Sequence, residues 1–327
     1  TNTALGYVAL TANTTGASNV AVGYSSLGSN STGSNNTAVG CAALVSNTTA
    51  NDNSAFGFRA METNTTGNTN SAFGQFALFA NTTGRFNMAY GSGSLDSNTT
   101  GESNVAMGYL ALGAVTTNGN NVAIGHESLK CNTGYENTGL GNQAGDEITT
   151  GDQNTAAGSN ALGKVTTGDG NTGLGRAAGD LTTTGGNNIT IGINSDPTSA
   201  TVSNEITLGN SANDNLRCAD TSISSLSDLR DKTNVEDIPH GLDYILALRP
   251  VKFDWNTRDG SRIDKKDYGF IAQELDQVEE TFGNKKYTRL VNKENPEQWE
   301  ADPMKTYPIL IKAIQELKKE IDLLKNK

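Results

Sequence analysis

The sequence predicts a mainly β fold: a parallel β-solenoid, followed by a small α+β unit that ends in a coiled-coil helix. Three observations support this: a 17-residue repeat in the first two thirds of the chain, a change in composition near residue 225, and a terminal heptad pattern. We expect the repeats to span residues 1–212, a connector 213–226, and the α+β unit 227–327.

Composition divides the 327-residue chain. Residues 1–225 hold 33 of the 37 glycines but only 6 Lys+Arg and 15 Asp+Glu, whereas residues 226–327 hold 18 Lys+Arg and 20 Asp+Glu. The net charge of −11, without a basic cluster, argues against nucleic-acid binding, because phosphate contacts need basic side chains. The sequence has no run of about 18 apolar residues, the length that a membrane-spanning helix needs. It also shows no charged segment followed by an apolar one, the pattern of a signal peptide.

Cysteines and histidines are few and far apart. Cys41, Cys131 and Cys218 form neither a disulfide framework nor a zinc pattern, and His126 and His240 offer no metal pair. We therefore expect no metal and no cofactor.

A glycine closes a recurrent triplet, most often Ala-apolar-Gly, in thirteen copies. The spacing is 17 residues in every interval but that from Gly125 to Gly141, which is 16; we place the deletion between Leu129 and Thr133. The thirteen glycines are Gly6, Gly23, Gly40, Gly57, Gly74, Gly91, Gly108, Gly125, Gly141, Gly158, Gly175, Gly192 and Gly209.

Other columns keep the same register, including an Asn four residues before the glycine in twelve copies, from Asn2 to Asn188. Seventeen residues are too few for a helix pair with its turns, whereas a short strand plus Thr-Gly and Asn turns fits this length. Such coils stack about 4.8 Å apart, so identical side chains form ladders and thirteen coils make a rod roughly 60 Å long. We interpret the Asn column as an internal amide ladder.

Two other interpretations of the repeat are weaker. Ice binding by a Thr ladder needs Thr-x-Thr on one face, but here the threonines are adjacent and point to opposite faces. The glycosylation-type sequons follow from the repeat and carry no information without a secretory context. They begin at Asn13, Asn30, Asn47, Asn64, Asn81 and Asn98.

The repeat resembles the head repeats of trimeric autotransporter adhesins, in segments such as Asn104–Gly108 and Asn121–Gly125. Those heads are left-handed parallel β-rolls packed three around an axis, and the same style occurs in bacteriophage tail-fibre shafts. The resemblance implies a homotrimer, although the 17-residue period departs from the shorter coil of adhesin heads. Because the sequence starts at Thr1 inside a repeat, we expect a fragment of a longer protein.

The end of the chain predicts a helix at about 305–326. Five apolar residues are spaced 4, 3, 4, 3, as in a heptad seam: Leu310, Ile314, Leu317, Ile321 and Leu324. We favour a short intersubunit coiled coil over an amphipathic helix packed on its own unit. Ile at a with Leu at d nominally favours two strands, but the attached solenoid argues for three.

The start of the charged part reads Ser-Ser-Leu-Ser-Asp-Leu-Arg-Asp-Lys over residues 224–232. From spacing alone this is a helix start, with Ser225 as N-cap and Asp228 as the capping-box acid. The wider order of motifs also includes Leu246–Val251, Tyr268–Glu274 and the heptad helix. This order resembles the S74 peptidases, the self-cleaving intramolecular chaperones of phage tail spikes and fibres, over about residues 222–327.

The resemblance implies a unit that trimerises, guides folding of the upstream β-structure and then cleaves itself off. The Ser–Lys dyad of the family corresponds to Ser227 and Lys232, and its scissile bond to Leu226–Ser227. A serine needs a base, and lysine can be that base only when burial or a cationic neighbour lowers its pKa. Arg230 is a candidate neighbour, and Asp228 could orient the loop.

Three functional interpretations follow. The first is a phage-like trimeric fibre in the virion, whose single-turnover chaperone unit is released after assembly. The second is a bacterial trimeric adhesin head, which requires a membrane anchor of β-strands where this chain carries the charged helix Lys318–Lys327. The third keeps the terminal unit as a non-catalytic trimerisation domain. A host-surface glycan or receptor is a candidate partner, which the sequence does not identify.

Overall fold

The computed structural model describes residues 1–213, 227–257, 263–283, 285–293 and 299–326. The chain divides into two compact units, Thr1–Asn210 and Ser211–Lys327, which we describe separately. The expected connector 213–226 lies outside the described residues except for Asn213.

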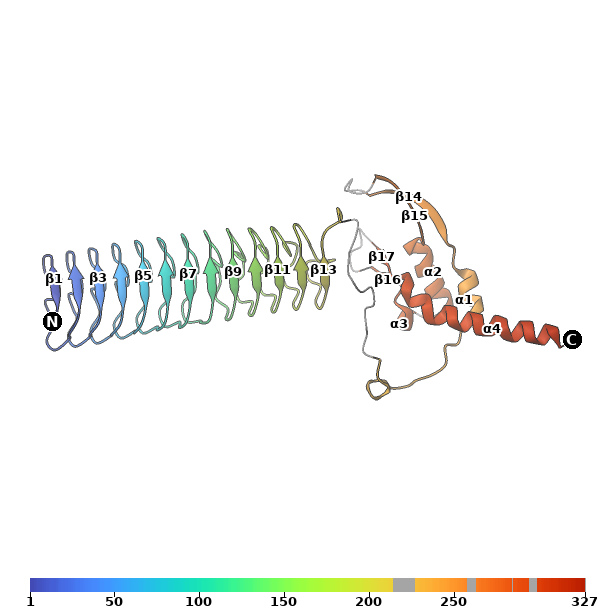
Figure 1. Ribbon diagram of the computed structural model, residues 1–327, viewed down its shortest axis with the longest axis horizontal. Coiled ribbons are helices and arrows are strands. Elements are labelled where there is room, and N and C mark those ends of the chain that lie inside the picture. Colours follow the sequence, from blue (N-terminus) through green and yellow to red (C-terminus); the bar gives the residue numbers. More distant parts are fainter. Residues whose placement is uncertain (214–226, 258–262, 284, 294–298, 327) are drawn as a thin grey trace. The chain divides into compact units, whose positions relative to one another are not determined.

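The first unit is the predicted parallel β-solenoid (Figure 1). Each of its thirteen strands pairs in parallel and in sequence order with the next, so that equivalent residues of adjacent coils lie side by side, as Ala21 does with Ala38. The strands are β1 (Thr3–Leu5), β2 (Val20–Val22), β3 (Thr37–Val39), β4 (Ser54–Phe56), β5 (Ser71–Phe73), β6 (Met88–Tyr90), β7 (Val105–Met107), β8 (Val122–Ile124), β9 (Thr138–Leu140), β10 (Thr155–Ala157), β11 (Thr172–Leu174), β12 (Ile189–Ile191) and β13 (Ile206–Leu208).

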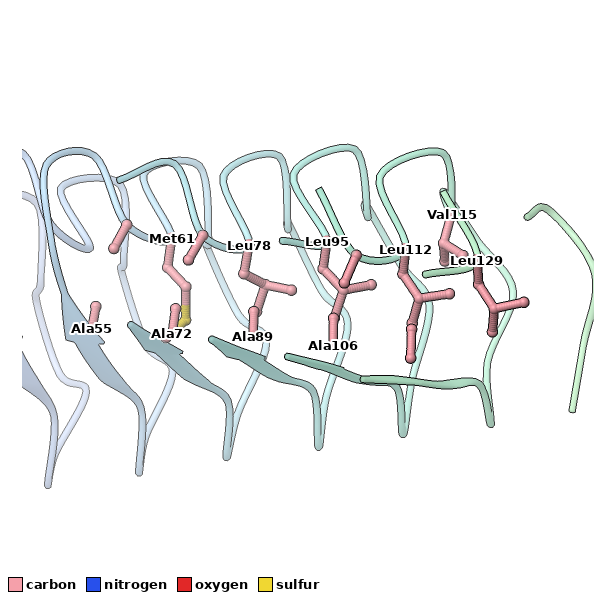
Figure 2. Close-up of a cluster of buried hydrophobic side chains, with 14 of the residues drawn as sticks. Ala55, Met61, Ala72, Leu78, Ala89, Leu95, Ala106, Leu112, Val115 and Leu129 are labelled. Atoms are coloured by element: carbon pink, nitrogen blue, oxygen red, sulfur yellow. The ribbon is translucent and has the colours of Figure 1, made fainter. Parts of the chain in front are cut away.

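Two apolar columns fill the solenoid interior. The middle residue of most strands is a fully buried alanine, and four residues after the column glycine stands a large buried side chain such as Leu78 or Leu95 (Figure 2). In the ninth coil this large residue is replaced by Gly145, and the space is filled by Ile148, three residues later. Small residues on the strand thus leave room for one large residue per coil.

The single deletion lies one position later than predicted. In regular coils the turn reads Asn-Thr-Thr-Gly, and the Asn amide donates to the glycine carbonyl three residues on, as from Asn98 to Gly101. In the eighth coil Asn132 donates to Gly134, two residues on. Thr133 still donates its N–H to Thr149, so the missing residue falls between Thr133 and Gly134.

The second unit is the predicted α+β structure. Its elements are a 3-10 turn (Leu229–Asp231), α1 (Leu242–Ala247), β14 (Val251–Asn256), β15 (Ile263–Gly269), α2 (Ala272–Phe282), α3 (Lys285–Thr288), β16 (Val291–Asn292), β17 (Glu300–Ala301), a second 3-10 turn (Pro303–Thr306) and α4 (Tyr307–Lys325). β14 pairs antiparallel with β15, and β16 with β17. A core of Tyr244, Leu275, Leu290 and Ile309 joins α1, α2 and α4.

Candidate functional site

The proposed nucleophile and base lie in hydrogen-bond contact. The Lys232 ammonium donates to the Ser227 hydroxyl at 2.7 Å and contacts the Ser227 carbonyl oxygen at 3.3 Å. The 3-10 turn Leu229–Asp231 lies between these two residues, and its compact backbone keeps their side chains within reach of each other. A serine hydroxyl within about 3 Å of an amine has the geometry that proton transfer requires.

Asp228 and Arg230 build this turn. The Asp228 carboxylate accepts the backbone N–H of Arg230 at 2.8 Å and so caps the turn. It also forms an ion pair with the Arg230 guanidinium at 2.6 Å, and these hydrogen bonds hold the pKa of the Asp228 carboxyl below its ordinary value. Arg230, expected as a cationic neighbour of Lys232, directs its guanidinium to Asp228. The expected N-cap, Ser225, lies outside the described residues.

The Ser–Lys pair is exposed to solvent. All residues from Ser227 to Asp237 are exposed, so nothing in the described part of this chain removes water from the Lys232 amine. Leu226, on the acyl side of the expected scissile bond, lies outside the described residues. The structure thus brings Ser227 and Lys232 together but leaves them in water.

The two other motifs of the second unit meet at an ion pair. Arg249, which follows α1, donates to the Glu274 carboxylate at 2.9 Å, and this bond lowers the pKa of the Glu274 carboxyl. Arg249 and Glu274 both line a cavity of about 390 Å³. Its lining includes Leu248, Phe270 and Val278. The sequence does not predict this cavity, although the motifs Leu246–Val251 and Tyr268–Glu274 supply much of its lining.

Two buried carboxylates of α2 were also not predicted from the sequence. Glu279 is 2% exposed and accepts the backbone N–H of Leu290 at 2.8 Å and the Thr288 hydroxyl. Asp276 is bound by Lys285 and Lys293. Burial raises the pKa of the Asp276 carboxyl, but the two lysines outweigh this effect and hold it below the ordinary value. Both acids fasten α2 to the segments that follow it.

α4 carries two apolar faces. Ile309 and Ala313 are 3% and 2% exposed and lie within the unit. The five predicted seam residues are instead between 40% and 70% exposed: Leu310, Ile314, Leu317, Ile321 and Leu324. The seam residues are therefore much less buried than Ile309 and Ala313, the residues through which α4 packs onto its own unit.

The asparagines of the solenoid are structural, as predicted for the column from Asn2 to Asn188. Each Oδ1 accepts the backbone N–H of the equivalent residue in the next coil, as Asn19 does from Asn36 at 2.9 Å and Asn188 from Glu205 at 3.0 Å. A second ladder runs through the sequon positions, where Asn47, for example, donates to Asn30 at 2.8 Å. The sequon residues from Asn30 to Asn98 are fully buried, so their amides are not accessible to modification.

Among the residues that the structure describes, no set of three His, Cys, Asp or Glu side chains is arranged to hold a metal ion. Within the same residues, no helix combines the length and the apolar character needed to cross a bilayer.

Comparison with protein families gives one match. Residues 227–284 match the family model described as chaperone of endosialidase, Peptidase S74. The matched segment begins at Ser227 and contains the Ser–Lys pair, α1, β14, β15 and α2. Comparison with curated proteins and with solved structures gives no match. The family match and the β-solenoid together fit a tail fibre with a C-terminal chaperone unit.

Proposed function

We propose that this chain is part of a trimeric, phage-type tail fibre whose C-terminal unit assembles three copies, guides folding of the solenoid and then cuts itself off between Leu226 and Ser227. The observation that carries the proposal is the 2.7 Å contact between Lys232 Nζ and Ser227 Oγ at the first residue of the segment that matches the chaperone family.

The reaction uses one bond of the chain itself. Ser227 Oγ attacks the carbonyl carbon of Leu226, and neutral Lys232 takes the hydroxyl proton and returns it to the departing amide nitrogen of Ser227. This leaves Leu226 as an ester on the Ser227 oxygen, with a free amine on Ser227. Water then hydrolyses the ester, which gives a Leu226 carboxylate and a new N-terminus at Ser227. Each copy turns over once.

Assembly of several copies would remove water from the Lys232 amine. Because Lys232 is exposed in the single chain, its amine must lose water before it can act as a base. Packing of neighbouring copies over residues 227–237 would bury it. Cleavage then follows assembly, and loss of the unit makes unfolding of the fibre hard to reverse.

Mass spectrometry of the freshly expressed chain tests cleavage. We expect a new N-terminus at Ser227 in the wild type, an uncleaved but assembled Ser227→Ala or Lys232→Ala chain, and normal cleavage in the Thr233→Ala control. An intact 34.2 kDa wild-type chain in the assembled state would contradict self-cleavage and favour the non-catalytic trimerisation unit. Full release from Ser227→Ala would refute the role of Ser227.

The seam of α4 tests assembly. Leu317→Lys places a charge in the exposed seam, whereas Gln315→Lys adds the same charge outside it. We expect the first variant to lose both the trimer, measured by light scattering, and cleavage, while the second keeps both. Equal behaviour of the two variants would contradict a coiled coil at this seam.

A further inference from the structure

The sequence contains one Asn-Gly pair, Asn118–Gly119, in the turn of the seventh coil. Asparagine is chemically labile, and a following glycine has no side chain to keep its nitrogen away from the asparagine side chain. Asn118 occupies the place that Gly101 has in the regular turn, so its side chain belongs to neither buried ladder. Its amide is instead half-buried, and its hydrogen bonds with Thr117 and Thr133 lie at the exposed surface.

The backbone nitrogen of Gly119 has no hydrogen bond within the described part of the chain. At the same position of other coils, the N–H donates to a side chain one coil further on. Ser34 donates in this way to Asn51 at 2.7 Å, and Tyr135 donates to Asp152 at 2.7 Å. The residue one coil after Gly119 is Tyr135 itself, whose side chain has no acceptor close to the backbone. The Gly119 nitrogen is therefore free to react.

The reaction joins this nitrogen to the neighbouring side chain. Base removes the Gly119 N–H proton, and the nitrogen attacks the Asn118 side-chain carbonyl carbon. The bond from that carbon to the side-chain amide nitrogen breaks, and the amide nitrogen takes up a proton and leaves as ammonia. A five-membered succinimide remains, and water opens either of its two ring C–N bonds. One water is consumed, one ammonia is released, and position 118 becomes aspartate or isoaspartate.

The Asn118 amide also supplies a contact at the deletion. In regular coils the carbonyl of the first turn threonine accepts backbone N–H groups from the preceding coil, as Thr99 does from Thr82 at 2.8 Å and from Thr83 at 3.3 Å. In the eighth coil, which lacks one residue, the Thr133 carbonyl accepts the Asn118 side-chain amide. A carboxylate at position 118 would set an acceptor against this carbonyl, so this contact between the two coils would be lost.

From these observations we propose that Asn118–Gly119 is a site of spontaneous deamidation, at which the folded chain gains a negative charge and loses the hydrogen bond to Thr133. The free Gly119 nitrogen controls the rate. The product weakens the solenoid next to the coil that already lacks one residue. The reaction needs neither cleavage nor assembly, so it is independent of the proposed function.

Peptide mass spectrometry of the full chain, kept folded in mildly alkaline buffer, tests the site. We expect position 118 to gain, over time, the mass difference between an amide and a carboxyl group, and a protein isoaspartate methyltransferase to label the product. Asn142, which is exposed and is followed by Gln143, is the internal control and should keep its amide. An Asn118 amide that persists in the folded chain, while the same chain in guanidinium loses it, would overturn the proposal.

Two variants of Tyr135 test the role of the Gly119 nitrogen. Tyr135→Asn supplies an acceptor of the kind that Asn51 offers to Ser34, and attack must first break the new bond. We therefore expect deamidation to slow about fivefold, the factor that corresponds to one ordinary hydrogen bond. Tyr135→Phe adds no acceptor and should react as fast as the wild type. Equal rates in the two variants, both shown to be folded by far-UV circular dichroism, would contradict control by this nitrogen.

The effect of the product is measured on a chain that carries the charge from the start. Asn118→Asp should unfold at a lower guanidinium concentration than the wild type, because it lacks the donor to Thr133. Asn120→Asp adds the same charge at an exposed position two residues further on and should unfold as the wild type does. Equal midpoints for the two variants would overturn the loss of the contact between the coils.

Discussion

The main-chain oxygen of Gly125 occupies the space that a Cβ atom on Gly108 would need. The two atoms would stand closer than 3.0 Å, and Gly108 also has a φ of +145°, which L side chains rarely adopt. Because the close neighbour is backbone of the next coil, it cannot move without breaking the strand pairing. The column glycine therefore permits the coil spacing that strand pairing imposes.

Gly108→Ala should destabilise the solenoid by about 3 kcal/mol or more, since it combines a strained φ with a backbone clash. Far-UV circular dichroism during guanidinium unfolding of the full chain measures this loss. Gly113→Ala in the same coil is the control, because its Cβ would meet its nearest neighbours at ordinary contact distance, 3.4 Å or more. Equal midpoints for the two variants would show that the column glycine is dispensable.

The sequence predicted the solenoid well because one steric requirement recurs in every coil. The glycine column alone fixed the number of strands, and the column from Asn2 to Asn188 correctly predicted a ladder. The second ladder was missed, because Asn-Thr-Thr also reads as a sequon and a turn, and only the structure shows Asn30 to be buried. The deletion was misplaced by one position, since two adjacent threonines make the alignment of Thr133 ambiguous.

The site was less predictable, because its contacts depend on the local path of the backbone and not only on the number of residues between the side chains. A Ser and a Lys five residues apart meet only because the intervening turn forms, and the Asp228 cap sets that turn. Charge alone could not tell whether Arg230 would pair with Asp228 or stand beside Lys232. The buried acids Glu279 and Asp276 lie in α2, a helix rich in acidic residues, and from the sequence alone acids in such a helix are expected to face solvent.

The second asparagine ladder predicts that a substitution of Asn64 lowers the unfolding free energy of the solenoid. Its amide donates to Asn47 Oδ1 and to the Gly67 carbonyl at 3.0 Å each, and its oxygen accepts from Asn81 at 2.7 Å. Asn64→Val would leave the buried Asn47 oxygen without this donor, so we expect a loss of about 1–3 kcal/mol in unfolding free energy. Urea unfolding followed by far-UV circular dichroism measures it.

Asn142→Val, at an exposed position, is the control for Asn64→Val. The wild-type chain already contains one ladder end of this kind, because Val115 follows Asn98 in the column and the buried Asn98 oxygen has no hydrogen-bond partner. The variant should therefore fold, with reduced stability. A midpoint equal to that of the control would mean that the ladder contributes nothing.

In the second unit, Glu316 of α4 caps α1. Its carboxylate accepts the backbone N–H of Leu242 at 2.7 Å. Glu316→Ala removes this acceptor, so we expect about 1 kcal/mol of destabilisation. Both tryptophans of the chain, Trp255 and Trp299, lie in this unit, so tryptophan fluorescence during urea unfolding reports on it alone. Gln315→Ala, one residue away and exposed, should unfold as the wild type does, because alanine is at least as good a helix former as glutamine. A matching loss there would show that the effect of Glu316→Ala does not come from the contact with the Leu242 N–H.

The last prediction concerns pH and Asp146. Burial raises the pKa of its carboxyl above the ordinary 3.8, and the nearby Glu147, Glu127 and Asp180 raise it further. The folded chain therefore holds this proton to a higher pH than the unfolded chain does. The resulting stabilisation is fully present below the unfolded pKa and is lost as pH rises through the folded pKa.

Asp146→Asn cannot ionise, so it avoids the loss of stability that the wild type suffers when the Asp146 carboxyl loses its proton. At pH 7 the variant should therefore unfold at a higher denaturant concentration than the wild type. The difference between the two should shrink as pH falls through the raised pKa toward the ordinary value of 3.8. Circular dichroism of the solenoid across a pH series measures it. Asp52→Asn, at an exposed position, is the control and should track the wild type. A variant that is less stable than the wild type at pH 7, or a difference that grows toward acid pH, would show that the Asp146 carboxylate stabilises the coil in its charged form.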